Sequence, residues 1–198
     1  DADATVTVTW GDGSTNSTAT ASGAGAWTAS HTYADGPAIR VIKADAPGAD
    51  QIAAILTVAN VAPTITGVSV SPGTGIDEGG TGSLGGTYTD PGTLDPQTVV
   101  IDWGEGTTTE VAVAAGAGTF SADHAYLDDD PTATAEDTYE VAVTIRDKDG
   151  ATDSDTASAI VKNVAPGDLQ IPSATWAGWI ATLDGDGHLQ VPEGVEVT

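Results

Sequence analysis

The stretch VVIDWGEGTTTE, residues 99–110, decides the fold class of this chain. Apolar and polar residues alternate up to Trp103, and a Gly-Glu-Gly turn and a Thr-rich segment follow. Alternation of this kind predicts a half-buried β-strand, with Val99, Ile101 and Trp103 on one face. The turn predicts that the chain folds back as an antiparallel hairpin. The stretch therefore predicts an antiparallel sheet with a Trp in its core.

The same pattern occurs earlier in the chain, as VTVTWGDGSTNS at residues 6–17. Three residue pairs share one spacing of 93 residues: Trp10 with Trp103, His31 with His124, and Tyr33 with Tyr126. The segment Asn-Val-Ala-Pro also occurs twice, at residues 60–63 and 163–166, 103 residues apart. Self-similarity at a fixed period indicates a repeat architecture.

The repeat spacing predicts one complete domain and two partial ones. A unit of about 100 residues has the size of an immunoglobulin-like sandwich. We expect residues 1–60 to be the C-terminal part of a domain, residues 61–163 a complete domain, and residues 164–198 the start of a further repeat with an inserted Trp-containing segment. A half-sandwich leaves strand edges unpaired. We therefore expect this chain to be a window of a longer tandem array, or its partial domains to be completed by another chain.

Composition and charge agree with an all-β protein and exclude several functions. The chain has 25 Gly, no Cys and no Met, which excludes disulfides and zinc-thiolate sites. No apolar run reaches the roughly 18 residues of a membrane span, so we expect no membrane insertion. Acids outnumber bases by 29 to 5, for a net charge of −24. Such a charge repels nucleic acid and favours cations, although solubility alone also explains it.

Two longer stretches carry a resemblance to a known family. WGDGST followed by SHTYADG, and WGEGTT followed by DHAYLDDD and DTYEVAVTIRDKDG, resemble the signature of polycystic-kidney-disease-type (PKD) domains. The resemblance covers residues 6–60 and about 76–163, with Glu105 in place of the usual Asp. It implies tandem immunoglobulin-like (PKD-type) β-sandwich domains. The Asn-Val-Ala-Pro linkers and the segment TDPGTLD further resemble tandem arrays of large secreted or surface proteins of bacteria and archaea, which implies an extracellular location.

The placement of the acids suggests a calcium site. In a sandwich of this topology, the loop at residues 89–96 and the turn at residues 146–150 lie at the end where the linker after Asn60 enters. Calcium takes about six to eight oxygen ligands, several of them carboxylates. The resemblance extends to the calcium-binding PKD-like domains of bacterial collagenases and implies a site at this corner. The candidate ligands are Asn60, Glu78, Asp90, Asp95, Asp147 and Asp149. The alternative is that Asp-Pro-Gly and Asp-Lys-Asp-Gly are ordinary turns.

Two further candidate sites lie towards the end of the chain. LDGDGHLQVPE, residues 183–193, places Asp184 and Asp186 at the first two ligand positions of an EF-hand but lacks the later ones, so it predicts at most a loose cation-binding turn. Trp176 and Trp179 are candidates for a flat platform on which sugars stack. Their spacing is equally that of core residues on one helical turn.

No pattern indicates catalysis. His31 and His124 occupy matched positions in repeated units, so we interpret them as packing and hydrogen-bonding residues, and no nucleophile lies in a recognisable catalytic context. The function that we expect is a non-catalytic extracellular structural or adhesive repeat, a stalk or spacer stiffened by calcium, whose partners are neighbouring repeats. The alternatives are a filament in which partial end domains of self-associating chains complete one another, and a polysaccharide-binding accessory module of a secreted hydrolase.

Overall fold

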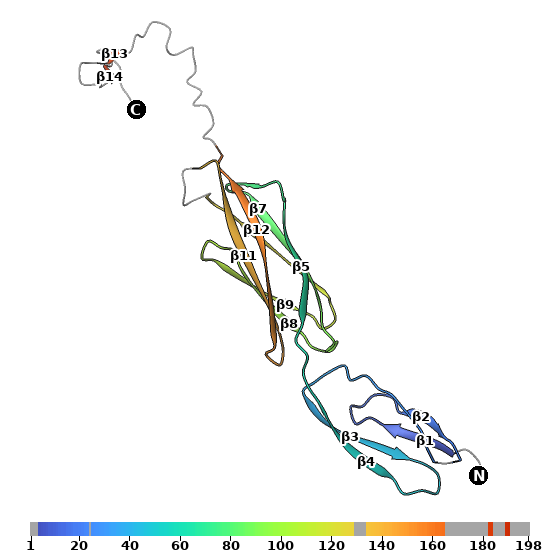
Figure 1. The fold of residues 1–198 in the computed structure, drawn as a ribbon. Coiled ribbons are helices and arrows are strands. Elements are labelled where there is room, and N and C mark those ends of the chain that lie inside the picture. Colours follow the sequence, from blue (N-terminus) through green and yellow to red (C-terminus); the bar gives the residue numbers. More distant parts are fainter. Residues whose placement is uncertain (1–3, 24, 129–133, 165–181, 184–188, 191–198) are drawn as a thin grey trace. The chain divides into compact units, whose positions relative to one another are not determined.

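The computed structural model describes residues 4–23, 25–128, 134–164, 182–183 and 189–190 (Figure 1). The chain divides into one compact unit of residues 1–164 and a second of residues 165–198. Every regular element of the described residues is a β-strand. Within these ranges, no helix has the length and apolar character that crossing a membrane requires. The all-β prediction is confirmed.

The first 60 residues form one four-stranded sheet in the order β2-β1-β3-β4. Its strands are β1 (Ala4–Thr9), β2 (Ser17–Ala21), β3 (Ala38–Asp45) and β4 (Ile52–Val58). All its pairings are antiparallel. Val6, Val8 and Trp10 are buried, as alternation predicts, and they form a small core with Ala21 and Ala44.

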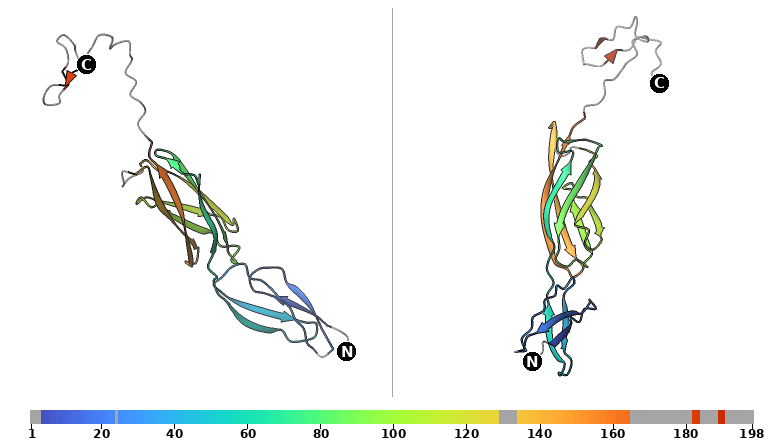
Figure 2. Two further views of the ribbon diagram at one scale, coloured as in Figure 1. Left: turned by 45° about the horizontal axis from the view of Figure 1, so that its top comes forward. Right: turned by 90° about the vertical axis from the view of Figure 1, so that its right-hand side faces the viewer.

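Residues 64–162 form a sandwich of two sheets, seen from two further directions in Figure 2. The smaller sheet has the order β10-β7-β5 and the larger β6-β12-β11-β8-β9. The strands are β5 (Thr64–Ser71), β6 (Ile76–Asp77), β7 (Thr81–Thr89), β8 (Gln97–Asp102), β9 (Thr108–Val113), β10 (Thr119–Ala125), β11 (Glu136–Asp147) and β12 (Thr152–Lys162).

The core of this sandwich comes from both sheets. From the larger sheet, Val99, Ile101 and Trp103 are fully buried, as are Val143 and Ile145 on β11. From the smaller sheet, the core includes Leu84, Tyr88 and Phe120. The alternating residues of two facing sheets therefore share one core, as in immunoglobulin-like sandwiches.

The Gly-acid-Gly turns close the hairpins β1–β2 and β8–β9. Both glycines of the second turn have a φ of +87°, a left-handed conformation that side chains disfavour. Gly104 also passes close to the neighbouring strand β11, because a Cβ at this position would lie 2.7 Å from the carbonyl oxygen of Glu140. Gly11 approaches Val41 on β3 in the same way. The repeated motif thus combines a tight turn with close backbone packing.

The long hairpin β11–β12 positions the acidic loops. Its turn, residues 148–151, lies near the loop between β7 and β8, because β8 pairs with β11 up to Gln97 opposite Asp147. In the second unit, only β13 (Thr182–Leu183) and β14 (Leu189–Gln190) are described. The candidate residues Asp184, Asp186, Trp176 and Trp179 lie outside the described residues, so the predictions made for them stay predictions.

Candidate cation site at a carboxylate cluster

Three segments that are distant in sequence bring carboxylates together at one end of the sandwich. Asp90 and Asp95 come from the loop between β7 and β8, and Asp147 ends β11. One carboxylate oxygen from each lies within 4.8 Å of the others. Asn60, in the linker after β4, joins them because its Nδ2 donates to Oδ2 of Asp147 at 2.7 Å. The cluster therefore has contributions from both sides of this linker.

Asp147 is a buried carboxylate with full hydrogen bonding. Its Oδ1 accepts the backbone N–H groups of Asp149 and Ala151, both at 2.9 Å, and its Oδ2 accepts from Asn60. Such bonds hold the turn after β11 in shape and favour the ionised carboxylate. Asp147 is thus both a turn residue and an oriented anion.

Asp90 is oriented in a similar way. Its Oδ1 accepts the backbone N–H of Gly92 at 2.8 Å, and its Oδ2 accepts Nε2 of Gln97 at 2.5 Å. Gln97 is buried, and its Oε1 has no hydrogen-bond partner in the described structure. The loop therefore presents an uncompensated amide oxygen beside two aligned carboxylates.

Asp95 is the residue that turn chemistry leaves unexplained. It is 1% exposed, and its Oδ2 has no hydrogen-bond partner among the described residues. Its Oδ1 forms an ion pair with Nζ of Lys148 at 2.9 Å, without the geometry of a hydrogen bond. Gly92 leaves room for this carboxylate, since a Cβ at Gly92 would collide with Oδ2 of Asp95. An ion of the opposite charge is the partner that these atoms lack.

Electrostatics supports the same interpretation. Burial raises the pKa of Asp95, although the ion pair with Lys148 opposes the shift. The ionised form of Asp95 is therefore under-compensated at neutral pH. In contrast, Lys148 lowers the pKa of Asp35, which shares the same ammonium group from the first sheet. The cluster holds more negative charge than its one lysine compensates.

The donor set fits a hard divalent cation. Asp90, Asp95 and Asp147 supply three carboxylates, and orphaned oxygens remain on Asp95 and Gln97. Calcium binds such mixed oxygen donors from adaptable loops, and backbone carbonyls or water complete its shell. Neutral nitrogen and sulfur donors, which zinc or copper prefer, are absent from this group.

The other two candidate ligands lie elsewhere. Asp149 groups with Asp35 and Asp95 around Lys148. The side chain of Glu78 accepts the backbone N–H of Val164 at 3.1 Å, so it contacts the linker that leaves the domain and not the one that enters it. Sequence reasoning did not single out Asp35, Gln97 or Lys148. The repeat held one signal, because Asp35 follows Tyr33 by two residues as Asp128 follows Tyr126.

The two histidines pack on tryptophans. His31 stacks on Trp10 with ring centroids 4.9 Å apart, and its Nε2 lies 2.6 Å from Oδ2 of Asp12. His124 stacks on Trp103 at 4.7 Å, and its Nε2 lies 2.8 Å from Oε1 of Glu105. The acid of each Gly-acid-Gly turn is thereby tied to the His of the same repeat. This duplicated geometry is that of packing and hydrogen bonding, which is how the sequence interprets both histidines.

Comparisons with known proteins find similar structures but no sequence family. No family model matches the chain, and no curated protein matches it. The PKD domain of an M14-like peptidase from a Thermoplasmatales archaeon is 22% identical, with a TM-score of 0.38, over 54% of this chain and all of that one. A tetra-tandem repeat from the extending region of a large adhesion protein is 20% identical, with a TM-score of 0.45, over 80% of this chain.

A third similar structure belongs to a 1.5-MDa bacterial ice-binding adhesin, at 18% identity and a TM-score of 0.34 over 83% of this chain. The chain spans 41% and 55% of the lengths of the two adhesin structures. At these identities the likeness concerns the fold and not the function. The chain is therefore similar to PKD domains and to tandem adhesin repeats.

Proposed function

We propose that this chain is a segment of an extracellular structural or adhesive repeat protein, a spacer in which calcium binds the carboxylate cluster and stiffens the linker at Asn60. The observation that carries the proposal is the buried Asp95, whose Oδ2 has no partner among the described residues. Asp90, Asp95 and Asp147 would hold the ion, with Gln97 and Asn60 beside them. When bound, calcium would compensate their charge without taking part in any reaction.

The linker contacts explain how an ion at this place would act mechanically. Asn60 bonds to Asp147, and the backbone N–H of Leu94 donates to the carbonyl oxygen of Ala34 at 3.2 Å. Both contacts join the first 60 residues to the acidic loops. A cation that fixes Asp147 and the loop containing Asp95 fixes these contacts as well. Because binding to the folded state alone stabilises it, calcium would lower the frequency of local opening at the linker.

Calcium titration calorimetry with a glycine variant tests the site. Gly92→Ala places a methyl group where Oδ2 of Asp95 lies, so we expect it to weaken calcium binding at least about tenfold. Gly73→Ala is the matched control, because a Cβ there meets nothing within 4 Å. We expect one calcium site in the natural sequence and in Gly73→Ala, and slower amide hydrogen exchange at residues 60–61 when calcium is present. Equal binding by Gly92→Ala, or no binding by the natural sequence, contradicts the proposal.

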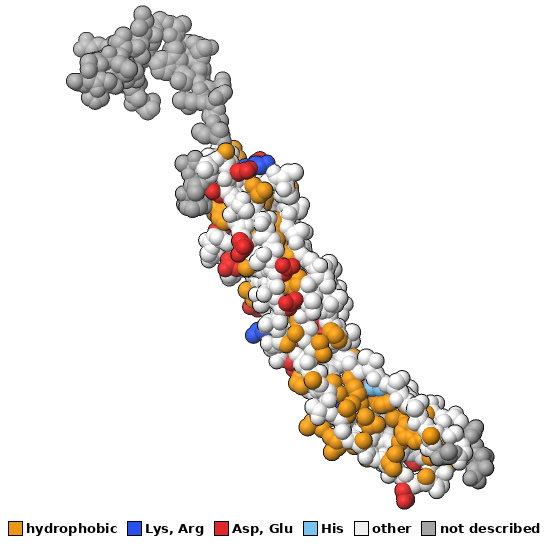
Figure 3. Space-filling view, in the orientation of Figure 1, with side chains coloured by type: hydrophobic (Ala, Val, Ile, Leu, Met, Phe, Trp, Pro, Cys, Tyr) orange, Lys and Arg blue, Asp and Glu red, His pale blue; other side chains and the backbone are white. Residues whose placement is uncertain are grey.

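A second candidate function, assembly between chains, is favoured by the exposed inner face of β4. Leu56 and Ala159 lie four residues before their respective Asn-Val-Ala-Pro segments, yet Leu56 is 39% exposed whereas Ala159 is 1% exposed. Ile52, on the same face, is 58% exposed. Figure 3 shows hydrophobic side chains gathered on the visible surface of this sheet. In the sandwich, the sheet of β5, β7 and β10 covers the corresponding face.

Completion of the first sheet by strands of a second copy predicts concentration-dependent assembly. The expected result by light scattering, at a salt concentration that screens the net charge of −24, is a mass that rises with protein concentration. Leu56→Asp should abolish the rise. Ile55→Asp, a change on the opposite face of the same strand, should leave it unchanged. A constant monomer mass for the natural sequence excludes this candidate.

A further inference from the structure

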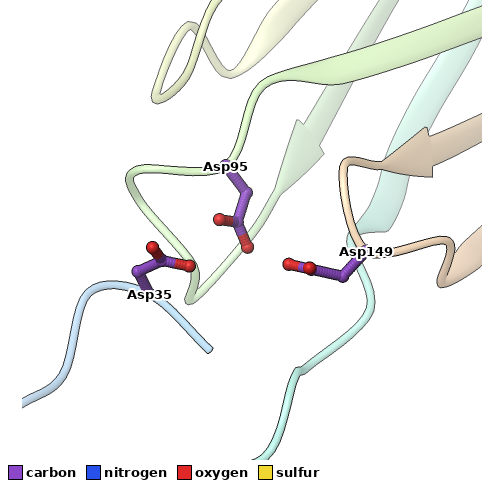
Figure 4. Close-up of side chains that lie close together, drawn as sticks. All are labelled: Asp35, Asp95 and Asp149. Carbon is purple, nitrogen blue, oxygen red and sulfur yellow. The ribbon is translucent and has the colours of Figure 1, made fainter. Parts of the chain in front are cut away.

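Lys148 lies among three carboxylates that come from three different segments. Figure 4 shows Asp35, Asp95 and Asp149 pointing toward one another at the junction between the first sheet and the sandwich. Nζ of Lys148 lies 2.7 Å from Oδ1 of Asp35, 2.9 Å from Oδ1 of Asp95, and forms an ion pair with Asp149. It also donates to the carbonyl oxygen of Gly36 at 3.3 Å. Four oxygens around one ammonium group are a cation site with a tethered cation.

This site and the candidate calcium site share a ligand. Asp95 belongs to both groups of carboxylates, with Asp35 and Asp149 on one side and Asp90 and Asp147 on the other. Its Oδ1 pairs with Lys148 and its Oδ2 has no partner among the described residues. A divalent ion at the second group and the ammonium of Lys148 would thus compete for the charge of one buried carboxylate, and they would repel each other.

Resting on the proposed calcium site, we infer that Lys148 is the resident cation of the junction, which holds Asp35 to the sandwich without metal and weakens the binding of a divalent cation there. The contacts with Asp35 and Gly36 explain the first half of this role, since they connect the first 60 residues to the turn after β11. The shared Asp95 explains the second half.

Lysine is suited to this role, and the chain offers a matched control. Its ammonium group is a compact charge on a flexible stem, so it can leave one set of oxygens without rearranging the backbone. Lys162 also donates to a backbone carbonyl, that of Thr74, but it has no ion pair with a carboxylate in the described residues. A change at Lys162 therefore removes one positive charge and leaves the junction intact.

Thermal unfolding and calcium titration of Lys148→Met and Lys162→Met, beside the natural sequence, test the inference. In chelator, we expect Lys148→Met to lower the unfolding midpoint by about 4 to 8 °C, because the carboxylates lose their cation. In calcium titrations of the same variant, we expect the dissociation constant to fall about tenfold or more, because the competing charge is gone. Lys162→Met should show neither effect.

The outcomes separate this inference from the calcium proposal. If the natural sequence binds calcium and Lys148→Met binds it equally or more weakly, the inference is overturned and the calcium site stands. If calcium binds Lys148→Met but not the natural sequence, Lys148 excludes the ion and the calcium-stiffened spacer is overturned instead. An unchanged midpoint of Lys148→Met in chelator overturns the first half of the inference. Absence of binding to both proteins overturns both proposals.

Discussion

Replacing Asp95 by Asn is expected to stabilise the protein in chelator and to abolish its response to calcium. At neutral pH the folded protein holds Asp95 ionised with an unpartnered Oδ2, and the raised pKa of this carboxyl group means that its charge costs stability. A raised folded pKa is a contribution that favours the protonated, low-pH form and is unfavourable above it. A neutral amide removes this cost, which for a buried unsatisfied charged group is about 1 to 3 kcal/mol.

The gain is not offset by the loss of Lys148. Lys148 is 33% exposed and keeps its ion pairs with Asp35 and Asp149, so its charge is not left uncompensated. We therefore expect the midpoint of Asp95→Asn in chelator to rise by several degrees, and to be the same in calcium. The comparison variant is Asp123→Asn, an exposed acid on β10 that should behave like the natural sequence. A lower midpoint of Asp95→Asn in chelator would show that Asp95 is already compensated by Lys148, against the need for a metal.

The largest loss of stability is expected from Trp103→Ala. Trp103 is fully buried, stacks on His124 and donates from Nε1 to Oγ1 of Thr109 at 2.9 Å. Removal of a buried aromatic side chain costs about 3 to 5 kcal/mol. For a domain of this size that loss lowers the midpoint by at least about 12 °C. Thermal unfolding followed by circular dichroism measures it.

Trp10→Ala tests whether the two copies of the motif are equivalent in energy. Trp10 makes the same stack and the corresponding bond to Ser17, but its core has five fully buried residues against fourteen in the sandwich. We expect Trp10→Ala to leave the main transition, that of the sandwich, within about 4 °C of its natural midpoint. If Trp10→Ala and Trp103→Ala lowered that transition equally, the two sheets would unfold as one cooperative unit.

The sequence predicted those parts of the fold that depend on local pattern. Alternation placed Val99, Ile101 and Trp103 in the core, because the side chains of a strand point to opposite faces in turn. The Gly-acid-Gly turns were predicted as hairpin turns for the same local reason. The loss of cover over Leu56 followed from the repeat spacing as an uncovered face, although the exposed residues themselves were visible only in the structure.

The candidate site could be predicted only in part. Asp90 and Asp147 could be placed at one end because the topology of a sandwich fixes which loops meet. Lys148 and Asp35 could not, since they are 113 residues apart and their contact depends on how the linker turns. The unpartnered Oδ2 of Asp95 also depends on the room that Gly92 leaves, which no sequence pattern records. Glu78 was assigned to the entering linker, whereas its side chain contacts Val164.

The most direct test of the central claim is the thermal midpoint of residues 1–198 in calcium, in magnesium and in chelator at matched ionic strength. If calcium binds Asp90, Asp95 and Asp147 in the folded state, a concentration of about 100 times the dissociation constant adds roughly 2.7 kcal/mol. That corresponds to a rise of about 10 °C. Magnesium, which gives up its water reluctantly and demands octahedral geometry, should raise the midpoint much less. Three coinciding curves would contradict the account and leave the acidic loops as ordinary turns.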